Sequence, residues 1–179
     1  MNRDRQDITG GIGMAESYVL QNRCSLLFDL CKDIEGLVAQ LYHFYSDYFK
    51  DNVEISRMWK KTAMEEENHH LQFALAQRIA GDIICSANVD LDMIADTKDK
   101  LSKLVSAVIK NPPDLVTALS RAVEMEEKLA DLHASTVVNF ADAETQNMFK
   151  AMIGFDQEHV ETLRRYLAIT TLNKAEMAG

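Results

Sequence analysis

Residues that break helices are scarce in this chain of 179 residues, which contains two prolines and seven glycines. The prolines, Pro112 and Pro113, are adjacent, so the rest of the chain has none. Because turns depend on glycine and proline, such sparse punctuation favours a few long helices. The length suits one domain with a core large enough to exclude water from an internal site.

Long basic runs and long apolar runs are also missing. No block of lysines or arginines occurs and the formal net charge is -9, which argues against nucleic acid and anionic membranes as partners. Charged residues interrupt every apolar stretch well before the roughly 20 residues that a membrane-spanning helix requires. We therefore expect no transmembrane segment, no membrane partner and no nucleic-acid partner.

Cysteine is rare as well, with Cys24, Cys31 and Cys85 forming no CxxC pair. The start of the chain has no apolar stretch typical of a secretory signal. An odd number of cysteines in such a chain predicts reduced thiols. We therefore expect a cytoplasmic protein without a cysteine-ligated iron site.

The pattern of apolar residues predicts four long helices and one shorter helix. Their expected ranges are about 16–49, 51–81, 96–109, 112–140 and 142–170. The short connections favour an all-α bundle of two antiparallel helix hairpins, joined by a long crossover that contains the shorter helix. Residues 1–15 are expected to form a flexible N-terminus, 16–170 the domain, and 171–179 a C-terminal tail.

Two similar motifs, Glu66-x-x-His69 and Asp156-x-x-His159, lie 90 residues apart. Each follows a lone glutamate, Glu35 or Glu126, by about 30 residues. Apolar residues around the motifs repeat at the same offset, so the chain consists of two copies of a helix pair. Repeated carboxylates within apolar helix faces indicate a function beyond packing.

These spacings suit a pair of metal ions. Residues three apart on a helix are neighbours, so the carboxylate and the imidazole of each motif reach the same internal point. With the two lone glutamates they supply four carboxylates and two imidazoles, which suits iron or manganese. Zinc fits less well, because a closed tetrahedral site uses fewer oxygen ligands. The expected metal ligands are Glu35, Glu66, His69, Glu126, Asp156 and His159.

The register of the first motif is ambiguous, because Glu67-x-x-His70 overlaps it. Only Glu66 and His69 keep the 90-residue offset to the second motif. We therefore assign Glu67 and His70 to positions around the site or on the surface.

Tyr42 follows Glu35 by seven residues, and His133 follows Glu126 by seven. Seven residues correspond to two helical turns, so each lies on the same face as the glutamate before it. Two interpretations remain open for Tyr42 and His133. Each is a packed residue with a satisfied hydrogen bond, or a partner that orients a ligand and takes part in catalysis.

Four motifs combine these residues: Glu35-x6-Tyr42, Trp59-x3-Ala63-x2-Glu66-x2-His69, Ala122-x3-Glu126 and Phe149-x6-Asp156-x2-His159. Over about residues 25–168 they resemble the signature of rubrerythrins, a family of the ferritin-like superfamily. The resemblance implies a ferritin-like four-helix bundle that binds two iron ions per chain, with manganese as an alternative. It also implies a cytoplasmic homodimeric oxidoreductase that protects against oxidative stress as a peroxidase, reducing hydrogen peroxide or oxygen. The roles carried over by position are terminal carboxylates for Glu35 and Glu126, bridging carboxylates for Glu66 and Asp156, and one nitrogen ligand per iron for His69 and His159.

Three departures from the rubrerythrin pattern modify this expectation. The cysteine-ligated domain that relays electrons in rubrerythrins is absent from the sequence, so an external electron donor, such as a rubredoxin-like protein, is expected. Leu129 occupies the position of an additional family glutamate, and Asp156 replaces the usual glutamate. The remaining ligand set resembles a ferroxidase centre nearly as well, so an iron-binding or storage protein of the ferritin type is the alternative.

Overall fold

The computed structural model describes residues 9–79, 90–135 and 143–178. Within these ranges all regular structure is helical, and the prediction of an all-α fold is confirmed. The helices are α1 (Thr9–Tyr48), α2 (Val53–Ile79), α3 (Leu91–Lys110), α4 (Leu115–Ser135) and α5 (Ala143–Ala178). None of the described helices combines the length and apolarity needed to cross a membrane.

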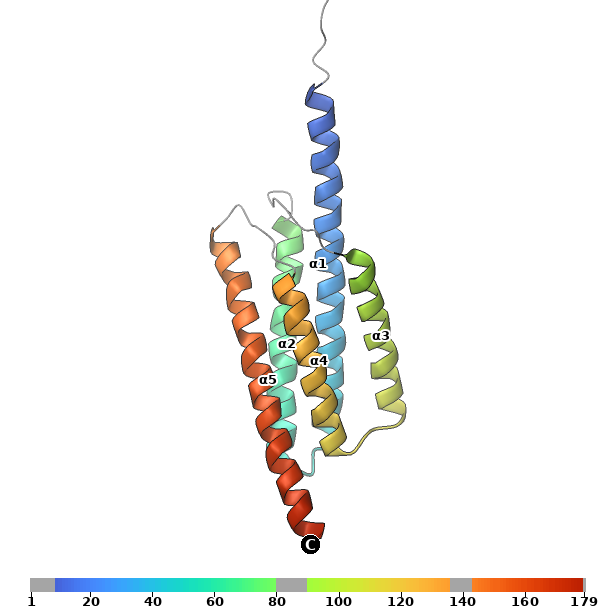
Figure 1. Cartoon of the computed structure of the whole chain (residues 1–179), viewed down its shortest axis with the longest axis vertical. Coiled ribbons are helices and arrows are strands. Elements are labelled where there is room, and N and C mark those ends of the chain that lie inside the picture. Colours follow the sequence, from blue (N-terminus) through green and yellow to red (C-terminus); the bar gives the residue numbers. More distant parts are fainter. Residues whose placement is uncertain (1–8, 80–89, 136–142, 179) are drawn as a thin grey trace, which may run out of the picture.

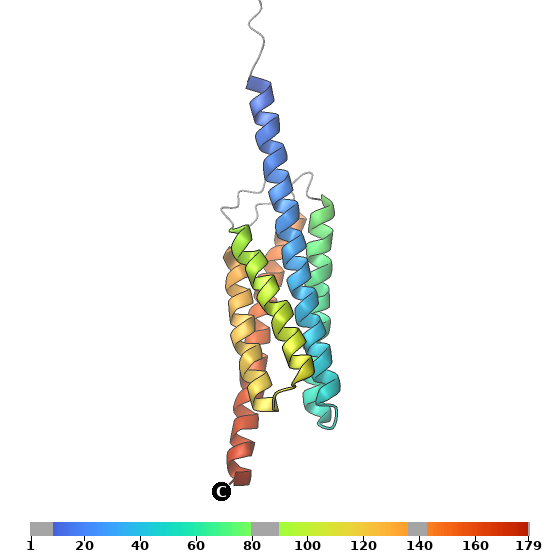
Figure 2. The same cartoon turned by 90° about the vertical axis from the view of Figure 1, so that its right-hand side faces the viewer.

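Four of these helices, α1, α2, α4 and α5, lie lengthwise beside one another (Figures 1 and 2). Helix α1 packs against α2, and α4 packs against α5, while α2 also contacts α5. The colour gradient in Figure 1 shows that α2 and α4 run in one direction and that α1 and α5 run in the other. Each packed pair is therefore antiparallel. The N-terminal end of α1 extends beyond the other helices at one end of the bundle, and the C-terminal end of α5 extends beyond them at the other end.

Helix α3 lies on the outside of the bundle, against α1. Its inward face is apolar and buried through Ile94, Leu101, Val105 and Val108. Lys98 of α3 forms an ion pair with Asp33 of α1, with Nζ and Oδ2 3.4 Å apart. In chain order α3 lies between α2 and α4, and it runs along the bundle. As a result, α4 begins at the same end of the bundle as α2.

Side-chain caps fix the starts of three helices. Asn52 Oδ1 accepts a hydrogen bond from the backbone N–H of Ile55 at the start of α2. Asp90 accepts from the backbone N–H groups of Asp92 and Met93 at the start of α3. Asp114 does the same for α4 through a 2.8 Å bond from Thr117. Such caps satisfy backbone donors that have no partner inside the helix.

The helix bounds differ from prediction at several ends. Helix α3 begins at Leu91 instead of Asp96, because the cap at Asp90 starts it earlier. Helix α4 begins after Pro112 and Pro113, which precede its cap. Helix α1 begins at Thr9 instead of about 16, and α5 continues to Ala178 through the segment expected as a tail. Three predicted helix boundaries lie outside the described residues: Gly81, Phe140 and Asp142.

An aromatic cluster fills the core between α1 and α2. The ring of Trp59 is fully buried, with its centroid 5.1 Å from that of Tyr42 and 4.9 Å from that of Tyr45. Tilted ring pairs at these separations are favourable beyond the area they bury. This cluster anchors one side of the polar site described below, since Tyr42 belongs to both.

The prediction of reduced thiols is wrong for one cysteine. Cys24 is disulfide-bonded, whereas Cys31 is free and buried. An odd number of cysteines leaves at least one thiol unpaired within a chain, but it does not prevent others from pairing. Which cysteines come close enough depends on helix packing, which cysteine count does not reveal.

Candidate metal centre

Two groups of three buried ligand atoms lie in the interior of the bundle. One group consists of Glu35, Glu66 and His69, and the other of Glu66, Glu126 and His159. The ligand atoms of each group lie within 4.8 Å of one another. Glu66 belongs to both groups, so the two form one continuous cluster. Its members come from all four long helices: α1, α2, α4 and α5.

The structure therefore brings five of the six expected ligands together. All five are at least 95% buried, with Glu35 fully inaccessible to solvent. The sixth, Asp156, belongs to α5 and precedes His159 by three positions, but its side chain lies outside the described residues. Leu129, at the position where the rubrerythrin pattern has an additional glutamate, is buried and apolar.

The register chosen from the repeat is the buried one. Glu66 and His69 face the interior, whereas Glu67 is exposed and pairs with Nε2 of His43 at 2.9 Å. His70 is half-buried, and its Nδ1 lies 2.8 Å from the backbone oxygen of Lys32. The overlapping motif thus points away from the cluster.

Both histidines of the cluster present Nδ1 to Glu66. His69 Nδ1 lies 3.1 Å from Glu66 Oε2, and also 3.7 Å from Glu35 Oε2. His159 Nδ1 lies 3.0 Å from Glu66 Oε1. The two imidazole rings stack with centroids 5.6 Å apart. Each carboxylate oxygen of Glu66 therefore faces one of the two imidazoles.

Tyr42 and His133 each contact a glutamate across the bundle. The hydroxyl of Tyr42 on α1 donates to Oε1 of Glu126 on α4. His133 on α4 in turn places Nε2 2.9 Å from Oε1 of Glu35 on α1, at ion-pair distance but without an aligned hydrogen bond. Both residues are buried beside the candidate ligands, an arrangement that fits either of the two interpretations.

Glu65 is a contact that sequence reasoning missed. Its Oε2 lies 3.0 Å from Nε2 of His159, the ring nitrogen opposite the one that faces Glu66. The repeat gave no signal for it, because Phe155 occupies the equivalent position in the second motif. The available signal was the run of three glutamates, in which Glu66 and Glu67 had assigned positions and Glu65 had none.

The pKa values of Glu126 and Glu35, two buried glutamates of the cluster, shift in opposite directions. Burial raises the pKa of Glu126, and the negative charge of Glu66 raises it further, to well above its usual value. Burial also raises the pKa of Glu35, but the charge of His133 and the contacts with His133, His69 and Glu66 together outweigh burial and lower the pKa to about 2.

The two histidines of the cluster bind protons tightly in this metal-free form. Burial lowers the pKa of His69, but its contacts with Glu35 and Glu66 and the negative charges of both glutamates together outweigh burial and raise the pKa to about 10. Burial also lowers the pKa of His159, whose contacts with Glu65 and Glu66 raise it to about 10. The protonated imidazoles of His69 and His159 thus supply positive charge that offsets the negative charge of the neighbouring carboxylates.

The donor atoms fit a divalent cation. Within the described part of the chain, neither oxygen of Glu35 nor Oε1 of Glu66 accepts an aligned hydrogen bond. Buried polar atoms without such partners are rare in folded proteins and require an explanation, such as an ion. An oxygen-rich set with two imidazoles suits iron or manganese better than a structural zinc ion.

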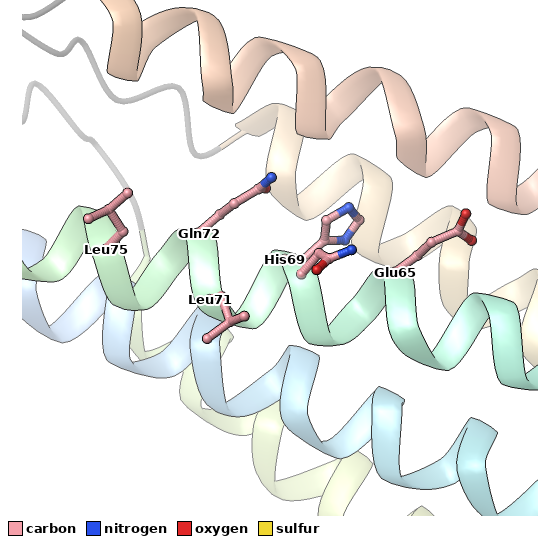
Figure 3. Close-up of a pocket in the computed structure, with 6 residues that line it drawn as sticks. Glu65, His69, Leu71, Gln72 and Leu75 are labelled. Atoms are coloured by element: carbon pink, nitrogen blue, oxygen red, sulfur yellow. The ribbon is translucent and has the colours of Figure 1, made fainter.

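A pocket of about 470 Å³ adjoins the cluster on the α2 side. Its described lining comprises Glu65, Asn68, His69, Leu71, Gln72 and Leu75. Figure 3 shows Glu65, His69 and Gln72 projecting from one side of α2 toward the ribbons of α4 and α5, while Leu71 points away from them. His69 thus belongs to both the buried cluster and the wall of the pocket.

The chain matches no protein-family model, no curated protein and no solved structure.

Proposed function

We propose that this protein is a non-haem diiron carboxylate oxidoreductase of the rubrerythrin type, which reduces hydrogen peroxide or oxygen with electrons from an external donor. The observation that carries the proposal is the sharing of Glu66 by two buried ligand groups. A carboxylate with one oxygen directed to each group suits a ligand that bridges two ions.

The helix arrangement supports a ferritin-like bundle. Two antiparallel helix pairs are joined by a long connection that contains α3, and each of the four long helices contributes a ligand candidate. Bundles with one long crossover build dinuclear carboxylate sites from a glutamate on two helices and a carboxylate-x-x-histidine motif on the other two. Glu35 and Glu126 occupy the first role, and the motifs on α2 and α5 occupy the second.

Glu35 and His69 would hold one ion, Glu126 and His159 the other, and Glu66 both, with Asp156 as the sixth ligand. Two ferrous ions held there would supply the two electrons that, with two protons, convert one hydrogen peroxide to two waters. Manganese suits the same ligands.

The chain itself supplies position and exclusion of water. Tyr42 holds Glu126 by a hydrogen bond, and His133 lies against Glu35, so that carboxylates on both sides of the cluster have a fixed partner. Ligands held this way keep their orientation without a metal, which lowers the cost of binding one. Burial strengthens each charge interaction in the site, because little water screens it.

The electron donor, the homodimer and the cytoplasmic location belong to the proposal as well. Sustained turnover would use a partner such as a rubredoxin-like protein as the electron donor. The expected assembly is a homodimer, whereas an iron-storage protein requires a closed shell of many subunits.

The experiment that tests the proposal is a rapid-mixing study of the anaerobic Fe(II) protein against peroxide and against oxygen. We expect faster oxidation by peroxide, and sustained turnover after a rubredoxin-like protein and its reductase are added. Faster oxidation by oxygen, together with a large assembly that retains many iron ions per chain, would support the ferroxidase and storage alternative. A protein that binds no iron would exclude both.

A further inference from the structure

The three consecutive glutamates of α2 point in three directions. Successive residues on an α-helix are about 100° apart around its axis, so each glutamate leaves α2 in a different direction. Glu66 points into the cluster, Glu67 pairs with His43 on α1, and Glu65 contacts His159 on α5. Of the three, only Glu66 is a member of the ligand groups.

His159 is held between two carboxylates of the same helix. Its Nδ1 lies 3.0 Å from Glu66 Oε1, and its Nε2 lies 3.0 Å from Glu65 Oε2. A neutral imidazole has one N–H donor and one lone-pair acceptor, so the partner of one nitrogen decides the state of the other. A carboxylate at Nε2 keeps the hydrogen there and leaves the lone pair on Nδ1.

We propose that Glu65 is a positioning residue of the metal centre: it accepts the Nε2 hydrogen of His159 and directs the Nδ1 lone pair to the position shared by Glu66 and Glu126. This inference rests on the proposed metal-binding function. Histidine ligands of protein metal sites commonly donate their other ring N–H to a carboxylate, which fixes the tautomer and the ring orientation. Here that carboxylate comes from the helix facing His159.

The ion pair of Glu65 with Lys61 on the surface accounts for the position of Glu65 less well than its contact with His159 does. Glu65 also lies 3.3 Å from Nζ of Lys61, but the side chain of Lys61 is 76% exposed, and exposed ion pairs contribute little. His159 is instead 5% exposed, so the imidazole side of its contact with Glu65 is buried. Glu65 is one-third exposed because it also lines the pocket beside α2. Glu65 thus contacts both the pocket and His159 of the second ligand group.

The test is a titration of the metal-free protein with Mn(II), comparing wild type with Glu65→Ala, Glu65→Gln and Glu67→Ala. The last variant is the matched control, because it removes a glutamate of α2, two positions from Glu65, that pairs with a histidine outside the cluster. We expect two binding steps in wild type and in Glu67→Ala. Glu65→Ala should weaken one step by roughly 10–100-fold and leave the other in place. Glu65→Gln should weaken the same step less, since its carboxamide oxygen still accepts the Nε2 hydrogen.

A second readout reports the tautomer itself. In the Zn(II)-loaded wild type, ¹⁵N NMR of His159 should show the hydrogen on Nε2, and Glu65→Ala should lose the protected N–H signal. If Glu65→Ala does not fold, Glu65→Gln decides the titration. Full affinity for both ions in a folded Glu65 variant would overturn the positioning role while leaving the metal centre intact. If wild type itself binds no metal, the proposed function fails and this inference falls with it.

Discussion

Tyr42 on α1 donates a hydrogen bond to Glu126 on α4, and its position is mirrored by His133 on α4, which lies 2.9 Å from Glu35 on α1. Each of these residues follows the glutamate of its own helix by two turns and contacts the glutamate of the other helix. The internal repeat therefore extends beyond the ligands to the residues that hold them. In one copy the partner is a phenol, and in the other an imidazole.

The first prediction concerns Tyr42→Phe. Removing the hydroxyl leaves a buried oxygen of Glu126 without its donor, so the free energy of unfolding of the metal-free protein should fall by about 1–3 kcal/mol. Urea unfolding measures the change. Tyr45→Phe is the control, because Tyr45 packs on the same Trp59 ring but belongs to neither of the ligand groups found among the described residues. Equal losses in both variants would assign Tyr42 to aromatic packing alone.

The second prediction concerns the register of the motif on α2. His69→Ala should weaken mainly one of the two Fe(II) binding steps, and His159→Ala mainly the other, because the two histidines belong to different ligand groups. His70→Ala should leave both steps intact, since His70 contacts the backbone of α1 instead. Anaerobic titration with calorimetric detection measures this. Loss of binding in His70→Ala with retention in His69→Ala would show that the register is wrong.

The third prediction is a pH dependence of the metal-free protein. The pKa values of His69 and His159 are raised from 6.5 to about 10 in the folded state. A raised folded-state pKa means that the native protein binds the proton more tightly than the unfolded chain does. The resulting stabilisation is complete below pH 6.5 and is lost as the pH rises to about 10. The raised pKa of Glu126 acts in the same direction.

Urea unfolding of the metal-free protein at intervals from pH 6 to pH 10 should therefore show a falling free energy of unfolding. Added Mn(II) should reverse the trend, because metal binds the deprotonated ligands, so the metal-induced gain in stability should grow with pH. The gain should largely disappear in the Glu66→Ala/Asp156→Ala double variant. A gain that does not change with pH would contradict the buried cluster. Glu35 does not affect this window, since its pKa of about 2 affects stability only under acid conditions.

Much of the fold could be predicted because helical periodicity and caps are local properties of the sequence. The four long helices follow the apolar pattern, and the repeat selects Glu66 and His69 over their neighbours. The start of α3 was missed because the cap at Asp90 precedes any clear apolar period. The repeat could identify ligand candidates but not their electrostatics: it gave Glu35 and Glu126 equivalent positions, yet their pKa values shift in opposite directions.

Contacts between helices were harder to predict. That Glu65 meets His159 depends on how α2 and α5 are rotated about their axes, and the period of one helix does not specify the rotation of its neighbour. The same holds for Cys24, whose disulfide depends on distances set by packing. Tyr42 and His133 were found only as candidates, because spacing places them on a face without naming what they touch.

The number of ferrous ions bound by wild type and by Glu66→Ala tests the central claim most directly. Because Glu66 is the one residue common to both ligand groups, its loss should weaken both binding steps, whereas Glu35→Ala and Glu126→Ala should each weaken mainly one. We predict two ions per chain in the anaerobic wild-type protein and a large loss of affinity for both in Glu66→Ala. Two ions bound with unchanged affinity in Glu66→Ala, or none in wild type, would contradict the account.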